Sequence, residues 1–216
     1  MRVMILSIIG PPASGKGTQA EMLAEKYSLY DVSTGQILRD MQVKMPELKE
    51  IMNQGLLVPD EITMNVFKKH MEEGKIFDNF ILDGSPRTVY QYRVILDWLE
   101  AKKKKMDNII FLGIDRSVAI KRISSRRQDK ITNKFYNLIT NPPPQSIDPN
   151  NLIIRNDDRP EVVLGRFEEY QRLTKPLIEV IEKDGILMRI DGNRPIEIIF
   201  ADIVGHLEKR NGKDKN

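Results

Sequence analysis

The chain has 216 residues, of which 40% are hydrophobic and 30% charged, a composition typical of a soluble globular protein rather than a disordered one. It contains no cysteine and two histidines, which excludes disulfides and cysteine nucleophiles and argues against thiolate or polyhistidine metal sites. The net charge of +3 is too small to indicate a nucleic-acid-binding protein, and no apolar run reaches the roughly 18 residues of a membrane span.

The first part of the chain predicts a strand, a glycine-rich loop and a helix. Residues 3–9 form an apolar run that stops at Gly10, and residues 16–27 place alanine and leucine at helical spacing. Residues 33–74 contain helical stretches but no apolar run typical of a central strand. We therefore predict a core strand and helix here, followed by a mostly helical insert.

Strands and helices continue to alternate through the rest of the chain. Strands that alternate with long helices pair in parallel and form a sheet covered on both faces. One polar segment, residues 128–158, interrupts this rhythm and predicts a second insert, either a loop or a small β unit. The predicted strands are residues 80–83, 108–114 and 187–190, and the predicted helices are residues 89–103, 117–127, 160–183 and 195–209.

The most informative motif is Gly-Pro-Pro-Ala-Ser-Gly-Lys-Gly-Thr at residues 10–18, between the first predicted strand and helix. The backbone N–H groups of such a loop and the N-terminus of the following helix favour a bound anion. Lys16 would reach the β- and γ-phosphates of a nucleotide, and the Thr18 hydroxyl would lie near Mg²⁺ or a phosphate. Gly17 displaces this hydroxyl by one place from the general phosphate-loop pattern. The alternative interpretation is a glycine-rich turn that binds nothing.

Other features narrow the class of phosphate-loop protein. Asp83 ends a predicted strand, a position typical of an acidic residue that acts on Mg²⁺ or its waters, although Asp-Gly is also a common turn. Residues 133–136 lack the aspartate of a guanine-binding Asn-Lys-x-Asp motif, and the chain is short for a motor ATPase. The remaining class is that of the small-molecule kinases.

Arginines are spread over the predicted core and both inserts, although each one alone could be an ordinary surface residue. Together they could neutralise the phosphates of two nucleotides, because arginine offers a bidentate fork to phosphate oxygens. No histidine or glutamate stands out as a catalytic base, and a phosphate acceptor, already an anion, needs none. The pattern therefore favours transfer from one phosphate to another. These arginines are Arg39, Arg87, Arg122, Arg126, Arg155 and Arg166.

Ordered motifs along nearly the whole chain resemble those of the adenylate kinase family, the nucleoside monophosphate kinases that interconvert ATP plus AMP with two ADP. The matching motifs have the family's order and include its displaced threonine. They are the phosphate loop at residues 15–20, the start of the AMP site at 33–39, the segment along the AMP base at 55–61, the signature at 83–91, the lid segment at 122–158, and Arg166.

The resemblance implies an α/β P-loop fold, a three-layer sandwich with a parallel five-stranded sheet. Residues 1–32, 63–125 and 161–216 would form the core, residues 33–62 a helical AMP-binding insert, and residues 126–160 a small lid. It further implies a cytoplasmic monomer that binds ATP and AMP or ADP, with Mg²⁺ held through phosphates and water. No zinc, nucleic acid or membrane partner is expected.

The resemblance also implies roles for individual residues. Lys16 would be the main cation on ATP, Asp83 would orient waters on Mg²⁺, and Gln91 would read the adenine edge of AMP. The catalytic residues would be Lys16, Asp83, Arg87, Arg126, Arg155 and Arg166. ATP would contact Ala13, Ser14, Gly15, Lys16, Gly17, Thr18, Arg122, Arg126, Phe135, Tyr136 and Arg194. AMP would contact Thr34, Arg39, Leu56, Leu57, Val58, Gly84, Ser85, Pro86, Arg87, Gln91, Arg155 and Arg166.

Three places depart from the family pattern. Ser85 stands where phenylalanine is usual, which implies an altered affinity or specificity for the acceptor. Ala13 stands where glycine is common, and a β-carbon at this position is tolerated if φ stays negative. The lid has neither the cysteines nor the histidine found in related lids, and residues 133–134 are Asn-Lys in place of Gly-Arg, so we expect no structural zinc.

Some alternatives stay open at this stage. Thr34 and Gln91 favour AMP as the acceptor, whereas residues 136–137 leave the donor base less certain, so a GTP:AMP phosphotransferase or a UMP/CMP kinase is the second interpretation. A non-catalytic nucleotide-binding module is a third, and the presence of Lys16 and of the arginines argues against it.

Overall fold

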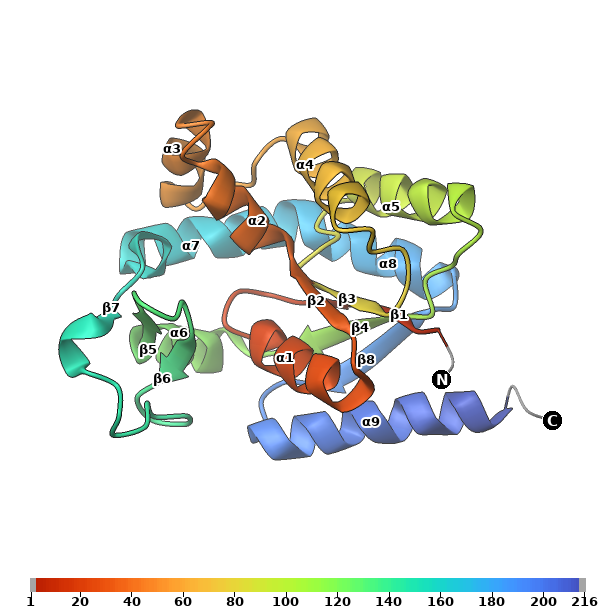
Figure 1. The fold of residues 1–216 in the computed structure, drawn as a ribbon. Helices are drawn as coiled ribbons and strands as arrows, with labels where there is room; N and C mark the ends of the chain where they lie inside the picture. The colour runs from red at the N-terminus through yellow and green to blue at the C-terminus, as the bar shows by residue number, and fades with distance from the viewer. Residues whose placement is uncertain (1–2, 214–216) are drawn as a thin grey trace.

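Within residues 3–213, which the computed structural model describes, five parallel strands form the central sheet in the order β2-β3-β1-β4-β8 (Figure 1). In the register of this sheet Ile5 lies opposite Phe80, and Ile8 lies opposite Ile110. Because every pair is parallel, the carboxyl ends of the strands meet at one edge. The strands are β1 (Ile5–Ile9), β2 (Tyr30–Ser33), β3 (Phe80–Asp83), β4 (Asn108–Gly113) and β8 (Leu187–Asp191).

Helices cover both faces of the sheet and complete three layers (Figure 1). Alternate residues of β1 point to opposite faces, so Ile5 and Ile9 pack with α4, α5 and α8, whereas Leu6 and Ile8 pack with α1 and α9. The predicted α/β fold with a parallel sheet is confirmed. These helices are α1 (Lys16–Tyr27), α4 (Asp60–Glu73), α5 (Val89–Ala101), α8 (Lys175–Lys183) and α9 (Ile196–Lys213).

The edge strand β2 is the element that the hydrophobic pattern did not predict. Val32 is its buried residue, while Tyr30 and Asp31 are exposed. An edge strand with one buried side chain carries no apolar run, so only the family resemblance, with its five strands, implied it.

Residues 33–62, the predicted AMP-binding insert, contain two short helices, α2 (Thr34–Met41) and α3 (Glu47–Asn53). Leu38, Leu48 and Val58 form a small hydrophobic core of their own. Gly55 has a φ of 77°, and a β-carbon on it would lie 2.8 Å from Val162 Cγ1. The backbone of this segment therefore packs directly against α7.

Residues 126–160, the predicted lid, contain a three-stranded antiparallel sheet in the order β6-β5-β7. This sheet confirms the prediction of a small β unit. Its strands lie beside α6 (Arg116–Ser124), away from the central sheet (Figure 1). They are β5 (Arg126–Asp129), β6 (Phe135–Asn137) and β7 (Leu152–Ile153).

The helix predicted at residues 117–127 is shorter than expected, because Arg126 and Arg127 belong to β5. Side chains take up the last carbonyl groups of α6: Ser125 Oγ donates to the carbonyl of Lys121 (3.0 Å), and Asn137 Nδ2 donates to that of Arg122 (3.0 Å). These hydrogen bonds end the helix and join its C-terminus to the lid.

The helix predicted over residues 160–183 is interrupted in its middle. It consists of α7 (Pro160–Glu169), a π-helical turn (Tyr170–Thr174) and α8. Pro176 has no N–H to donate to the carbonyl four residues earlier, so the regular pattern cannot continue there. Thr174 Oγ1 donates instead to the carbonyl of Arg87 (2.9 Å), which ties the turn to the loop after β3.

Candidate active site

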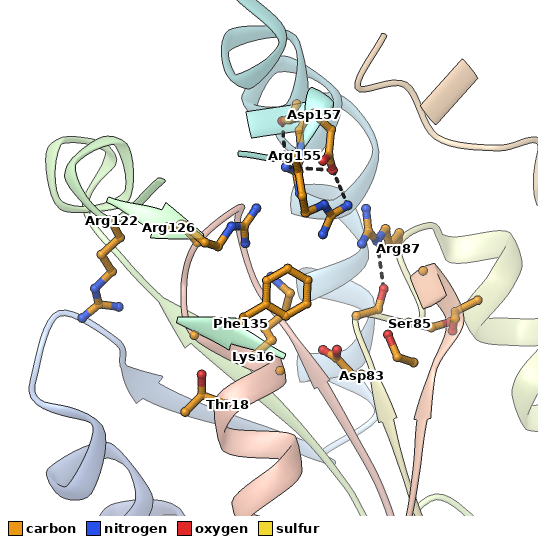
Figure 2. Close-up of a pocket in the computed structure, with 18 of the residues that line it drawn as sticks. Lys16, Thr18, Asp83, Ser85, Arg87, Arg122, Arg126, Phe135, Arg155 and Asp157 are labelled. Atoms are coloured by element: carbon orange, nitrogen blue, oxygen red, sulfur yellow. Dashed lines mark hydrogen bonds and ion pairs between the residues drawn. The ribbon is translucent and has the colours of Figure 1, made fainter. Parts of the chain in front are cut away.

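A cavity of about 620 Å³ lies at the carboxyl edge of the central sheet. The loops after β1, β3 and β8, the start of α2, and residues of the lid line it (Figure 2). Open parallel sheets bind ligands at this edge, and the volume suits a small-molecule site.

The loop after β1 closes around the ammonium group of Lys16. Lys16 Nζ donates hydrogen bonds to the carbonyl oxygens of Gly10 (3.0 Å) and Pro11 (2.8 Å). Ala13 in this loop has a φ of 60°, so the condition of a negative φ is not met. Its side chain packs against the hydrophobic cluster between α6 and α7, which helps offset the roughly 1 kcal/mol cost of a left-handed conformation.

Burial changes the protonation of Lys16. Burial first, and then repulsion from Arg87, lower the pKa of Lys16 to about 7, although attraction to Asp83 acts in the opposite direction. Without an anion in the cavity, Lys16 therefore loses its proton much more easily than an exposed lysine. A bound phosphate would raise the pKa of Lys16 again, because it stabilises the ammonium form.

Asp158 holds two arginines from different elements over the cavity. Its carboxylate accepts a hydrogen bond from Arg126 Nε of β5 (2.8 Å) and one from Arg166 of α7 (3.1 Å). The Asp158 side chain is 1% exposed. Burial alone would lower the pKa of Arg126, but the hydrogen bonds and attraction of Asp158 raise it overall. Arg126 is thus a fixed cation.

Asp157 and Phe135 organise the same group of cations (Figure 2). Asp157 Oδ2 accepts a hydrogen bond from Arg155 (2.7 Å) and lies 3.2 Å from the Arg166 guanidinium. The guanidinium carbons of Arg126 and Arg155 lie 5.6 Å and 5.4 Å from the centre of the Phe135 ring, within cation–π distance. Burial lowers the pKa of Arg155 to about 10, so it too is charged at neutral pH.

Two further arginines lie at the opposite wall, near the AMP-binding insert. Arg87 Nε donates to the carbonyl of Gly84 (2.8 Å), and Arg39 Nε donates to Gln36 Oε1 (3.1 Å). Burial is the largest cause that lowers the pKa of both guanidinium groups. Because arginine starts from a very high pKa, both remain cations that can bind a phosphate.

Gln91 lies on this wall and is hydrogen-bonded at both ends of its amide. Its Oε1 accepts the backbone N–H of Arg87 (2.8 Å), and its Nε2 donates to Asp60 Oδ1 (2.7 Å). Thr88 caps α5: its Oγ1 accepts the N–H of Gln91 (3.1 Å) and donates to Asp60 Oδ2 (2.7 Å). Asp60, the first residue of α4, therefore connects two helix N-termini beside the cavity.

Two buried hydroxyl groups also belong to this wall. Ser85 and Thr34 line the cavity, are 1% and 4% exposed, and find no hydrogen-bond partner for their hydroxyl oxygens among the described residues. Buried hydroxyls are nearly always paired, so these two are suited to a polar ligand. Ser85 thus presents to the cavity a polar atom that is unpaired within the described part of the chain.

The opposite end of the cavity is formed by Arg122 and Arg194. The guanidinium group of Arg122 donates to the carbonyl oxygens of Ser14 (3.5 Å) and Arg194 (3.3 Å). Arg194 itself forms an ion pair with Asp202 (2.5 Å). These contacts join α6, the phosphate loop and the start of α9.

The fold brings most of the predicted site residues to this one cavity. Two do not line it: Ser14 is fully buried with its Oγ 3.4 Å from Lys16 Nζ, and Pro86 lines a small neighbouring pocket. The predicted residues that line the cavity are Ala13, Gly15, Lys16, Gly17, Thr18, Thr34, Arg39, Leu56, Leu57, Val58, Asp83, Gly84, Ser85, Arg87, Gln91, Arg122, Arg126, Phe135, Tyr136, Arg155, Arg166 and Arg194.

Sequence reasoning gave no role to the carboxylates that hold these cations. Asp157 and Asp158 directly follow Arg155 and Asn156, a spacing that could have indicated ion pairs near the cavity. Asp60 gave a weaker signal, since an acidic residue after Pro59 is what any helix N-terminus favours.

Comparison with known proteins agrees with this geometry. The family model described as adenylate kinase matches residues 8–186. The chain belongs to the adenylate kinase family. An adenylate kinase of Archaeoglobus fulgidus is 37% identical over 214 residues (95% of this chain and 99% of the relative), and one of Caldanaerobacter subterraneus is 38% identical over 213 residues, 94% of each. One of Shouchella clausii is 35% identical over 215 residues, 96% of this chain and 99% of the relative.

Family membership confirms the resemblance read from the motifs and the prediction of a nucleoside monophosphate kinase. In the described part of this adenylate kinase, no helix is long and apolar enough to cross a membrane. Residues 3–213 contain no group of three or more His, Cys, Asp or Glu side chains arranged to hold a metal ion.

Proposed function

We propose that this adenylate kinase transfers the γ-phosphoryl group of ATP to AMP and forms two ADP. An oxygen of the AMP phosphate attacks the γ-phosphorus, the bond from that phosphorus to the β,γ-bridging oxygen breaks, and ADP leaves with the electron pair. The observation that carries the proposal is the convergence of Lys16 and of arginines from both inserts and the core on one cavity. Such cations stabilise charge on the transferred group.

The two ends of the cavity would hold the two nucleotides. The phosphate loop and Lys16 would bind the ATP phosphates, and Arg122 would stack on the donor base. Arg39 and Arg87 would bind the AMP phosphate, and Gln91 would contact the acceptor base. Between them Arg126, Arg155 and Arg166 would surround the phosphoryl group in transfer. No group needs to act as a base, because the attacking phosphate oxygen is already anionic.

The donor groups present fit a Mg²⁺ ion that arrives with ATP. Thr18 and Asp83 both line the cavity, and Asp83 Oδ2 lies 3.4 Å from the place of a β-carbon on Gly17, so a hydroxyl and a carboxylate lie close to the phosphate loop. Mg²⁺ prefers such oxygen ligands and is commonly held by few protein groups, together with phosphates and water. When bound, the ion would neutralise charge on the phosphates, while Asp83 would orient its waters.

The division of the chain fits a closing motion. We propose that residues 33–62 and 126–160 move over the core, formed by the remaining residues, when both nucleotides are bound. The lid already touches the core through Lys134 Nζ, 3.7 Å from Glu21 Oε1. Closure would exclude water from the cavity and so protect ATP from hydrolysis.

Rates of ADP formation from ATP, Mg²⁺ and AMP test this function. We expect fast turnover in the wild type, and a kcat at least about 100-fold lower in Lys16→Met and Arg87→Ala, because each removes a cation from the phosphates. Arg189→Ala is the control, since Arg189 pairs with Glu182 (2.9 Å) outside the cavity.

Near-normal turnover in folded Lys16→Met or Arg87→Ala would contradict the assignment. UMP, CMP and GMP as acceptors, and GTP as donor, distinguish the other nucleoside monophosphate kinases. A monomeric, cytoplasmic enzyme stays a prediction, and the sedimentation coefficient of the purified protein tests its monomeric state.

A further inference from the structure

The hydrogen bonds around Gln91 determine which way its amide faces. A carboxylate oxygen accepts hydrogen bonds, so the group 2.7 Å from Asp60 Oδ1 is assigned as Nε2 of Gln91. The backbone N–H of Arg87 can only donate, so the group 2.8 Å from it must be Oε1. The assignment of the two amide atoms therefore follows from the chemistry of their partners.

We propose that Asp60 is a positioning residue for acceptor specificity: it holds the Gln91 amide in one orientation and thereby favours adenine over guanine. This inference rests on the proposed function, in which Gln91 contacts the acceptor base. Asp60 touches no substrate in this scheme and acts through Gln91 alone.

The amide keeps one N–H and one lone pair for a ligand, in a fixed order. The pairing edge of adenine presents an acceptor, N1, beside a donor, the exocyclic amine, whereas guanine presents a donor at N1 beside an acceptor oxygen. A freely turning amide could match either edge. An amide held at both ends matches one edge and leaves unpaired polar groups against the other, which is costly in a buried site.

The same carboxylate keeps this wall rigid. Asp60 Oδ2 accepts the hydroxyl of Thr88 (2.7 Å), and that hydroxyl accepts the backbone N–H of Gln91 (3.1 Å). Gln91 is 3% exposed and Thr88 is 8% exposed, so water does not compete freely for these bonds. Asp60 therefore holds the side chain of Gln91 directly and its backbone N–H through Thr88.

Two substitutions of Asp60 test the proposal. Asp60→Asn keeps the size of the side chain but replaces one acceptor oxygen by an amide donor, so only the backbone N–H of Arg87 still sets the orientation of the Gln91 amide. Asp60→Ala removes the partner altogether. Glu61→Gln removes the same charge from the first turn of α4 at an exposed neighbouring residue and is the matched control. Thr88→Ala removes the cap of α5 but leaves the bond between Asp60 and Gln91.

The measurements are kcat and KM with AMP and with GMP, and calorimetric titration of each variant with AMP and GMP alone. In Asp60→Asn we expect the ratio of kcat/KM for AMP to that for GMP to fall about tenfold, the equivalent of one hydrogen bond. The loss should appear in the KM for AMP and in its dissociation constant, with kcat nearly unchanged, because base contacts are uniform binding. Glu61→Gln should keep the wild-type ratio.

A purely structural role for Asp60 predicts a different result. Asp60→Asn and Thr88→Ala would then both lower the melting temperature, while the ratio of AMP to GMP stays that of the wild type in each. That result, in folded protein, overturns the inference. Failure of the proposed function would give a different result from failure of this inference, because the wild type would then show no AMP-dependent turnover at all.

Discussion

Lys16 shows how a single residue of this site depends on its ligand. Its ammonium group bridges the carbonyls of Gly10 and Pro11, and its pKa is about 7 because it is buried beside other cations. A nucleotide that binds with several negative charges stabilises the protonated form. When the pH lies above the pKa of Lys16 in the ligand-free protein, nucleotide binding is therefore accompanied by uptake of a proton at Lys16.

This linkage predicts a pH-dependent affinity for nucleotide. With a pKa of about 7 for Lys16, proton uptake on ATP binding should be clearly larger at pH 8 than at pH 6. The affinity should therefore fall as pH rises above 7. Calorimetry of Mg²⁺–ATP binding in buffers of different ionisation enthalpy measures the uptake. Lys16→Met removes the titrating group, and equal uptake at pH 8 in both proteins would refute the prediction.

Most site residues could be predicted from the sequence, because the phosphate loop and the ordered arginine motifs are local patterns that carry their own chemistry. The conformation of Ala13 could not, since a φ of 60° depends on packing against α6 and α7. The role of Asp60 could not either, because its partners Thr88 and Gln91 are 28 and 31 residues away.

At the scale of elements, the lid is the part whose stabilisation could not be read from the sequence. A single carboxylate organises one of its turns: Asp129 accepts the N–H of Ile131 (3.0 Å) and the hydroxyl of Thr132 (2.7 Å). Lys130 Nζ also donates to the carbonyl of Asn150 (3.3 Å), in the segment directly before β7. Local hydrogen bonds thus hold the turns of a lid that has no cysteine.

Removal of Asp129 should loosen the lid and leave the core intact. We expect Asp129→Ala to increase amide hydrogen exchange at residues 130–137 and to lower kcat, since Phe135 would hold Arg126 and Arg155 less firmly. Asp97→Ala, at an exposed position of α5, is the control. Unchanged exchange in the lid of Asp129→Ala would contradict this role.

The hydrogen bonds from Ile131 and Thr132 lower the pKa of Asp129 below its usual value. A depressed carboxylate stabilises the folded form above its unfolded pKa and loses this contribution as pH falls through the folded pKa. The protection of the lid amides, measured relative to their intrinsic exchange rates at each pH, should therefore fall only under acid conditions, below about pH 4.

Long, strongly periodic elements were predicted to within a few residues, as for α1 and β3. The differences arise where tertiary contacts decide: β2 has little buried surface, α6 ends on hydrogen bonds from the lid, and Pro176 with Thr174 places a π-helical turn between α7 and α8. The partner of Arg122 at the end of α6, Asn137, is 15 residues away, and the partner of Thr174, Arg87, is 87 residues away.

At the scale of the whole molecule, the cavity brings together positively charged side chains. Their charge is fully balanced only when anionic ligands bind. Burial first, and then repulsion from other cations, lower the pKa of Lys16 and of Arg166. Asp83 opposes this shift at Lys16, and Asp157 and Asp158 oppose it at Arg166. The ligand-free protein therefore carries an electrostatic cost, which bound phosphates would relieve.

Saturation with both nucleotides should stabilise the fold measurably. At concentrations about 100 times each dissociation constant, linkage gives about 2.7 kcal/mol for each nucleotide and about 5 kcal/mol for the two, which corresponds to a rise in Tm of about 10–20 °C for a domain of this size. Thermal unfolding with and without ATP and AMP measures it. A rise of similar size in Lys16→Met would show that the phosphates are held elsewhere.

The contact at Gly55 has a consequence for how the two nucleotide sites can change. A β-carbon there would lie 2.8 Å from Val162 Cγ1 and 2.9 Å from Arg166 Cγ, on the helix that carries an arginine of the transfer site. Gly55→Ala should thus lower kcat with AMP, whereas Gly185→Ala, with a similar φ of 72° and open space around it, should lower stability alone. Equal kinetics in both variants would refute this.

Gly55 thereby couples sequence changes in the acceptor insert to the geometry of the transfer site. A substitution that reshapes the acceptor insert at this point should also displace Arg166 of the transfer site, so a change of acceptor preference here would also alter the rate of the reaction.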